Sequence, residues 1–131
     1  MEQHAIAVGS TFVWHELYAA EAQPAIDFYS KTLGWETEGM DMGEMGTYTM
    51  FKVNGTNVGG IMPTAGNPDM ANVPPHWSIY ISVDDVDARV AKAVENGATV
   101  LVPAMDIPTV GRMCLIKDPV GATVWFFKGT P

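Results

Sequence analysis

Alternation of apolar and polar side chains is clearest in the segment HWSIYISV, residues 76–83. The odd positions are all apolar, and they are Trp77, Ile79, Ile81 and Val83. The even positions carry a polar group, and they are His76, Ser78, Tyr80 and Ser82. A period of two predicts a strand with two unlike faces, so we expect the apolar face to pack against a helix-covered core.

Two other segments show helical spacing instead. Residues 19–35 place apolar side chains three or four positions apart, with Pro24 in the first turn and Gly34 as a stop. Residues 84–96 (DDVDARVAKAVEN) have an acidic first turn and are followed by Gly97. Both segments are predicted helices.

The other periodic segments are short enough to be strands, and the first of them is rich in β-branched and aromatic residues. They are residues 11–18, 35–38, 47–53 and 57–62 in the first part of the chain, then 98–102, 112–117 and 123–128 in the second. Asn54-Gly55 predicts a hairpin turn. The order strand, helix, three strands therefore occurs twice. We expect one domain of two modules, at about 11–63 and 76–128, joined by a proline-rich connector at 64–75.

Composition narrows the class of protein. The 131 residues are 47% hydrophobic and 17% charged, which excludes intrinsic disorder. The net charge of −8 argues against a basic nucleic-acid surface and against attraction to an anionic membrane. Cys114 is the single cysteine, so an internal disulfide and a cysteine-based zinc site are excluded. With no apolar run of about 20 residues and no leader-like N-terminal pattern, the expected compartment is the cytoplasm.

Three phrases of sequence, taken together, carry a resemblance to a known group of proteins. FYSKTLGW closes the first predicted helix, and the second module contains SVDDVDARVAKAVENGATV and KDPVGATVWFF. Over about residues 11–128 the chain resembles the vicinal oxygen chelate superfamily of glyoxalases, bleomycin resistance proteins and extradiol dioxygenases. The resemblance implies an α+β fold in which two βαβββ modules form a curved mixed sheet, a cup, with the helices outside.

The resemblance also implies metal-ligand positions on the first and last strand of each module. In this chain they fall on Trp14, Ser78, Trp125 and a glycine at 59 or 60. None of these offers a carboxylate, imidazole or amide, and a divalent ion needs three or four converging donors. A shift of one residue would bring in His15 and no other ligand. We therefore expect no metal ion and no cofactor.

The strand positions that would face the cup are mainly aromatic, with few polar groups, as is typical of a small-molecule pocket. The expected ligand-binding residues are Trp14, Tyr18, His76, Ser78, Tyr80, Arg112 and Trp125. Glu16 is a carboxylate between apolar neighbours on a predicted strand, and it is the candidate catalytic residue because a buried carboxylate suits general-base work.

Each candidate also has a simpler interpretation. Glu16 could be a structural carboxylate held by backbone amides or by a tyrosine. The aromatic residues could fill an ordinary core, and Arg112 could be a solvated charge at a strand end. His76 reads equally as a surface residue that ends the connector. His15 is favoured as packed under a helix, Cys114 as a small buried hydrophobe, and His4 is set aside as part of an N-terminal tail.

Two classes of function fit this pattern. The first is a metal-free binding module that sequesters a small apolar or aromatic molecule, as the bleomycin resistance branch does. The second is an enzyme of the glyoxalase (lyase) or dioxygenase type, either metal-dependent or using Glu16 as general base. The residues at 14, 78 and 125 favour the binding module. Its expected partners are a small-molecule ligand and a second copy in a homodimer, with no nucleic acid and no membrane.

Overall fold

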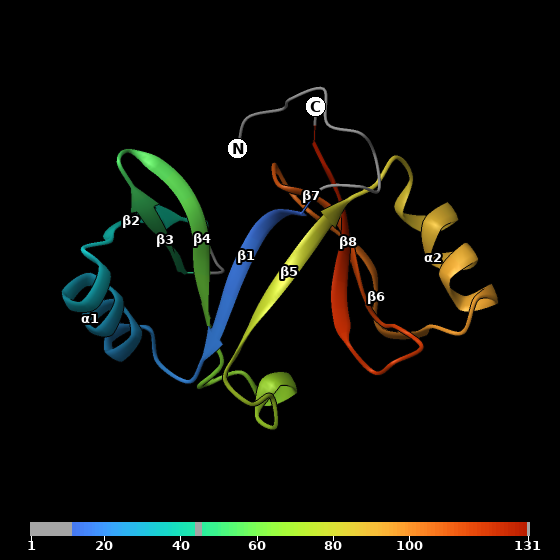
Figure 1. Ribbon diagram of the computed structural model, residues 1–131, viewed down its shortest axis with the longest axis horizontal. Helices are drawn as coiled ribbons and strands as arrows, with labels where there is room; N and C mark the ends of the chain where they lie inside the picture. The colour runs from blue at the N-terminus through green and yellow to red at the C-terminus, as the bar shows by residue number, and fades with distance from the viewer. Residues whose placement is uncertain (1–11, 44–45, 131) are drawn as a thin grey trace. The chain divides into compact units, whose positions relative to one another are not determined.

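The computed structural model describes residues 12–43 and 46–130, and its secondary structure repeats once along the chain (Figure 1). The first half contains β1 (Phe12–Ala19), α1 (Ala22–Leu33), β2 (Glu36–Asp41), β3 (Thr47–Val53) and β4 (Thr56–Pro63). The second contains β5 (His76–Ser82), α2 (Val86–Glu95), β6 (Thr99–Ile107), β7 (Gly111–Lys117) and β8 (Thr123–Gly129). A 3-10 turn, Pro68–Met70, lies in the connector. The predicted double βαβββ order is confirmed, and His4 lies outside the described residues.

The strands form an eight-stranded mixed sheet, which confirms the α+β class. Within the first half the strand order is β2-β3-β4-β1, and within the second it is β5-β8-β7-β6. In each half the first strand runs parallel to the last, and the hairpin strands are antiparallel. The described residues cluster into two compact units, one of residues 15–77 and the other of 12–14 with 78–130. Neither described helix is long and apolar enough to cross a membrane.

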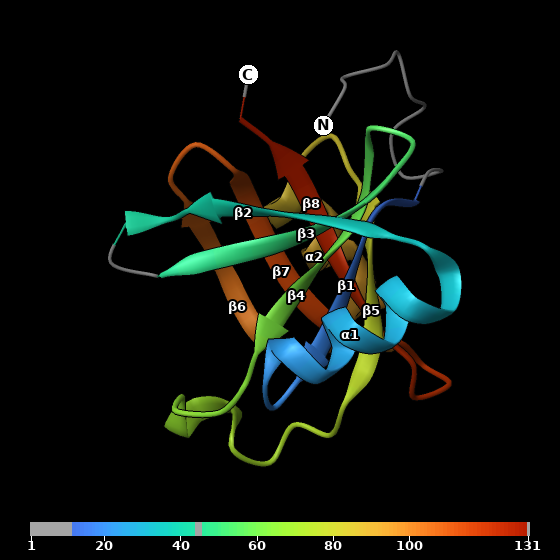
Figure 2. The same ribbon diagram turned by 90° about the vertical axis from the view of Figure 1, so that its left-hand side faces the viewer.

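In the unit of residues 15–77, α1 lies against β4 (Figure 2) and is fixed by an aromatic cluster. The ring of Tyr29 stacks on Trp35 with centroids 5.3 Å apart and meets the rings of Phe51 and Trp77 edge-on at 5.5 and 5.6 Å. Trp77 Nε1 also donates a hydrogen bond to the Tyr29 hydroxyl at 3.1 Å. Trp77 therefore faces the helix, as the alternation of its strand predicts.

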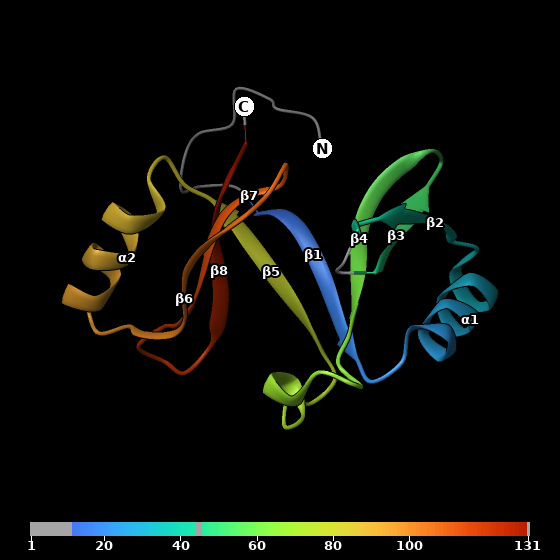
Figure 3. The same ribbon diagram turned by 180° about the vertical axis from the view of Figure 1, so that it is seen from behind.

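In the other unit, α2 packs against β6, β7 and β8 (Figure 3). The buried residues between the helix and the sheet are Val83, Val86, Cys114 and Ile116, with Ile81 and Phe126 among those packed around them. The Asp85 side chain caps α2 by accepting a hydrogen bond from the Ala88 amide at 3.0 Å. Ile81 and Val83 thus lie on the helix-covered face, again as predicted.

The sixth strand is longer than the sequence pattern indicates. A strand is predicted at residues 98–102, and β6 instead runs from Thr99 to Ile107 with Pro103 inside it. It is the last strand in the sheet order, and its pairing with β7 shifts register twice. An edge strand tolerates proline because one row of its amides needs no ladder partner, and bulges absorb the irregularity.

Candidate functional site

Four aromatic and apolar side chains lie buried together on the sheet face of the second half that is opposite to α2. Tyr80, Met113, Trp125 and Phe127 form this cluster, and the residues packed against it include Trp14 and Leu115. Side chains alternate between the two sides of a strand, so the neighbouring residues Cys114, Ile116 and Phe126 pack on the opposite side, against the helix. We call the group of Trp14, Tyr80, Met113, Trp125 and Phe127 the aromatic face.

The centre of the aromatic face is a pair of stacked rings. Tyr80 and Trp125 are register partners on the parallel strands β5 and β8. Their ring centroids are 5.5 Å apart and their planes differ by 7°, while Phe127 meets Tyr80 edge-on at 6.0 Å. The structure thus brings together three of the predicted ligand-binding residues, Trp14, Tyr80 and Trp125.

Ser78 lies two residues before Tyr80 on β5, so its side chain is on the same side of the sheet. It is 2% exposed, and within residues 12–43 and 46–130 its Oγ is a buried polar atom with no hydrogen-bond partner. Leaving a buried hydroxyl unpaired costs about 1–3 kcal/mol relative to a satisfied one. Ser78 is therefore the polar group at the aromatic face that calls for an explanation.

The first half holds a polar pair instead. Glu16 is 5% exposed, and its Oε2 accepts a hydrogen bond from the Tyr48 hydroxyl at 2.7 Å. Gly60 is the register partner of Glu16 on β4, and a β-carbon at Gly60 would overlap the Tyr48 hydroxyl and ring. The glycine therefore leaves the space through which Tyr48 reaches across from β3 to the carboxylate.

Tyr48 is a functional candidate that the sequence pattern did not single out. From the sequence, a structural Glu16 was expected to be held by backbone amides or by a tyrosine, but the sequence did not indicate which tyrosine. The signal is the glycine pair inside a strand in NVGGIM, since glycine within a strand often marks the close approach of another group. Identifying that group requires the strand register, which pairs Met50 with Gly60 and so brings β3 alongside.

The remaining histidine and tyrosine candidates lie in the unit of residues 15–77. The rings of Tyr18 and His76 are in contact, with centroids 4.9 Å apart, so two predicted ligand-binding residues adjoin. His76 Nδ1 also lies 2.8 Å from the Pro74 carbonyl oxygen. His15 is exposed, with Nδ1 3.1 Å from the Val58 carbonyl oxygen, and so is not packed under a helix as favoured from sequence.

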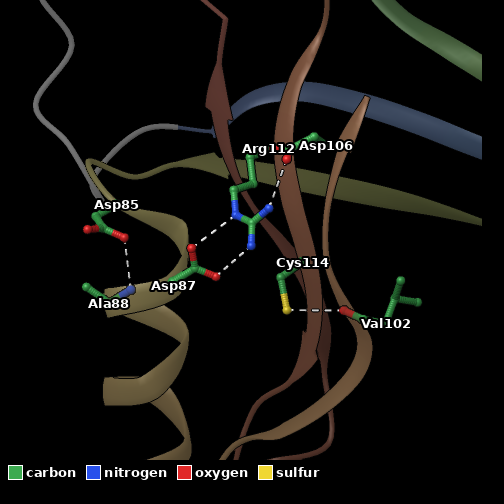
Figure 4. A network of polar contacts seen from close by, with 7 residues as sticks. All are labelled: Asp85, Asp87, Ala88, Val102, Asp106, Arg112 and Cys114. Carbon is green, nitrogen blue, oxygen red and sulfur yellow. Dashed lines mark hydrogen bonds and ion pairs between the residues drawn. The ribbon is translucent and has the colours of Figure 1, made fainter. Parts of the chain in front are cut away.

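The predicted placement of Arg112 on the ligand side is wrong. Arg112 Nε and Nη2 donate to the Asp87 carboxylate of α2 at 3.1 and 2.9 Å, and Nη1 lies 3.2 Å from Asp106 (Figure 4). The hydrogen bond from Arg112 lowers the pKa of Asp87 from its ordinary value. Residue 112 shares its side of β7 with Cys114, which faces α2, so its guanidinium meets the helix and not the aromatic face.

Cys114 matches the interpretation of a small buried residue. It is 1% exposed, and its Sγ donates to the Val102 carbonyl oxygen at 3.1 Å. Burial is the main cause that raises the pKa of its thiol, which disfavours the nucleophilic thiolate.

The side chains at the metal-ligand positions do not fit a divalent ion. Trp14 and Trp125 present indoles, which are not metal ligands, and Ser78 presents only an alcohol. The part of the chain that the structure describes contains no group of three or more His, Cys, Asp or Glu residues placed to hold a metal.

Residues 11–126 match the protein family described as the Glyoxalase/Bleomycin resistance protein/Dioxygenase superfamily. The chain belongs to this superfamily. The match spans both βαβββ modules and confirms the resemblance carried by the three sequence phrases.

Relatives with curated names are about twice as long as this chain. CFP32 of Mycobacterium tuberculosis, named as a proposed glyoxylase, is 36% identical over 121 residues, which are 92% of this chain and 45% of the relative. The anthracycline biosynthesis protein DnrV of Streptomyces peucetius is 28% identical over 124 residues, covering 86% of this chain and 45% of DnrV. The chain thus spans about half the length of these superfamily relatives.

Solved structures of lower sequence identity share the fold. Methylmalonyl-CoA epimerase from Mycobacterium tuberculosis superposes with a TM-score of 0.60 at 17% identity, covering 98% of this chain and 94% of the epimerase. A variant of the Streptomyces coelicolor epimerase, in complex with 2-nitronate-propionyl-CoA, gives a TM-score of 0.61 at 20% identity, covering 92% of this chain and 97% of the epimerase. At this identity the likeness is one of fold alone.

Proposed function

We propose that this superfamily member is a binding module for a small planar aromatic molecule, which it holds at the aromatic face without a resident metal ion. The observation that carries the proposal is the parallel stacking of Tyr80 and Trp125, with planes 7° apart, at the centre of an apolar cluster. Stacked aromatic pairs gain about 0.5–1.5 kcal/mol beyond the burial of their area, and a flat ligand can extend such a stack.

The absence of charged side chains among the five members of the aromatic face supports a neutral ligand. Affinity at these five side chains comes from apolar burial and stacking, with a few polar groups setting orientation. Anthracyclines are fused-ring aromatic compounds, and the relationship to DnrV is consistent with a ligand of that shape.

The proposal is tested on protein purified without a polyhistidine tag. Elemental analysis should find far less than one equivalent of Zn, Ni, Mn or Fe per chain. Naphthalene should bind by calorimetry or ligand-observed NMR, with unchanged affinity in EDTA, and its saturated analogue decalin should bind at least about tenfold more weakly, equivalent to ~1.4 kcal/mol.

A matched pair of variants locates the binding. Tyr80→Leu should weaken naphthalene binding, while Phe12→Leu, at a 58% exposed ring outside the aromatic face, should not. One equivalent of metal that a chelator removes together with the binding would contradict the proposal. Equal affinity for naphthalene and decalin would contradict it as well.

A second candidate function, an enzyme using Glu16 as general base, is favoured by one observation. Glu16 is a buried carboxylate oriented by the Tyr48 hydroxyl 2.7 Å from its Oε2. In a glyoxalase-type reaction it would accept the proton of a C–H bond beside a carbonyl group.

The enzyme candidate is tested with Glu16→Gln, which preserves shape and can still accept from Tyr48. If Glu16 is the base, solvent-deuterium exchange at the C–H of an α-hydroxy ketone such as hydroxyacetone should fall at least about tenfold while the thermal midpoint stays the same. If its role is structural, the variant should lose about 1–3 kcal/mol of stability without a specific change in exchange.

We also propose that the chain forms a C2 homodimer. Large apolar side chains are exposed on both halves, including Phe28 at 57% and Leu101 at 44%. Contiguous exposed apolar surface commonly marks an interface. Sedimentation at tens of micromolar should give twice the chain mass of 14.2 kDa, and a single species at the monomer mass would contradict the proposal.

A further inference from the structure

We infer that Ser78 supplies the directional hydrogen bond by which the aromatic face selects its ligand, so the ligand class is a neutral fused-ring aromatic compound with a hydroxyl or carbonyl oxygen on the ring. The inference rests on the proposed function and adds the polar part of the ligand to it. The observation behind this inference is a single hydroxyl group on β5, which is independent of the stacked rings.

The Ser78 hydroxyl is an exception to ordinary protein structure. Buried polar side-chain atoms nearly always have a hydrogen-bond partner, from the protein or from ordered water. Ser78 is 2% exposed, and its Oγ has no such partner among the described residues. Alanine would fill almost the same space without leaving a buried hydroxyl unpaired, so folding stability does not explain the serine.

Ser78 lies beside the stacked rings of Tyr80 and Trp125 along the strand. Two residues along a strand correspond to a rise of about 7 Å, so Ser78 and Tyr80 are successive side chains on one side of β5. A fused-ring compound lying against Tyr80 can extend along the strand toward Ser78. A single benzene ring has less reach in that direction.

The chemistry of the hydroxyl defines the oxygen group of the ligand. Serine offers one donor and two acceptor lone pairs, which complement either a carbonyl or a phenolic hydroxyl. The members of the aromatic face carry no formal charge that would pair with a carboxylate, phosphate or ammonium group. A site that holds a buried polar group rejects analogues lacking the complementary atom, because the group is then left unpaired in the complex.

The experiment compares 1-naphthol with naphthalene on the full chain and on Ser78→Ala. The wild-type chain should bind 1-naphthol at least about tenfold more tightly than naphthalene. In Ser78→Ala this preference should vanish through loss of 1-naphthol affinity, with naphthalene affinity unchanged. The thermal midpoint of Ser78→Ala should be equal or higher, because an unpaired buried hydroxyl is removed.

Ser82→Ala is the matched control, since Ser82 lies on the same side of the same strand. It should keep the preference for 1-naphthol. The inference is overturned if Ser78→Ala keeps the preference, if the wild-type chain has none, or if Ser78→Ala lowers the thermal midpoint and leaves the preference intact. If neither compound binds the wild-type chain, the proposed function itself fails; naphthalene binding without a preference removes only the role of Ser78.

Discussion

The two halves place different chemistry at the same point of the same topology. In each, the first strand runs parallel to the last, so that Glu16 lies opposite Gly60 and Tyr80 lies opposite Trp125. The glycine leaves room that Tyr48 fills to reach the carboxylate, whereas the tryptophan fills the room itself by stacking. The polar pair and the aromatic stack therefore differ in both register partners, on the first strand and on the last.

The two helices also differ, in how many contacts fix each of them. Helix α2 has a side-chain cap from Asp85, a buried Val86 and an ion pair from Asp87 to β7. Helix α1 has no side-chain cap bond at Glu21 and no buried residue. Fewer fixed contacts lower the free energy of local opening, so α1 should be the more easily opened helix.

The largest expected effect is in the aromatic stack. Trp125→Ala should lower the free energy of unfolding by about 3–5 kcal/mol, because it removes a buried ring and leaves a cavity. Val120, 88% exposed in the turn before β8, gives the control, and Val120→Ala should change stability by less than about 0.5 kcal/mol. Urea denaturation measures both. A loss below about 1 kcal/mol for Trp125→Ala would mean that the stack does not hold this half together.

The glycine opposite Glu16 gives the next effect. Gly60→Ala should destabilise the chain by about 1–3 kcal/mol, because its β-carbon would overlap Tyr48. In a Tyr48→Ala background the same substitution should be much less harmful, and a double-mutant cycle in urea measures the difference. Gly39→Ala on the exposed edge strand β2, where the added β-carbon would lie 3.1 Å from the Thr47 methyl group, serves as the milder comparison. Additive effects of the two substitutions would show that Gly60 is not there to admit Tyr48.

Helix capping gives a smaller and directly comparable effect. Asp85→Ala should cost about 1 kcal/mol, because the Ala88 amide loses its acceptor. Glu21→Ala should leave stability nearly unchanged, since Glu21 makes no side-chain cap bond. Equal losses in the two variants, measured by thermal or urea unfolding, would contradict the contrast between the helices.

The smallest effect is a pH dependence confined to α2. Hydrogen bonds from Arg89 and Arg112 lower the pKa values of Asp84 and Asp87, so the stabilisation is present above the unfolded-state value of 3.8 and is lost as pH falls through the folded-state values. Hydrogen exchange, corrected for the intrinsic rate, should show α2 amides losing protection in that acidic range. Asp87→Asn should lessen the change. A parallel loss in α1 would point to a global cause.

Local patterns were sufficient to predict most of the fold. The segment Thr47–Val53 forms a strand with the predicted bounds, and Asn54 and Gly55 turn with positive φ values of 49° and 80°. Both signals depend only on neighbouring residues, through side-chain alternation and the conformational preferences of asparagine and glycine. The βαβββ repeat followed from such signals.

Contacts between distant residues were not predictable in the same way. Arg112 pairs with Asp87, 25 positions away, and its side of β7 depends on strand register rather than on composition. Tyr48, which donates to Glu16, is 32 positions away, and its side chain occupies the space that Gly60 leaves open. Alternation placed Tyr80, and the resemblance to the superfamily placed Trp14 and Trp125, on the face where the three residues lie together.

The most direct test of ligand binding at the aromatic face is intermolecular NOE spectroscopy of the 1-naphthol complex, with methyl-labelled methionine and leucine. Met113 belongs to the aromatic face and Leu115 packs against it, whereas Met50 is a buried methionine of the first half. We expect NOEs from the ring protons of 1-naphthol to the methyl groups of Met113 and Leu115. Binding accompanied by NOEs to other methyl groups, and by none to these two, would contradict this expectation.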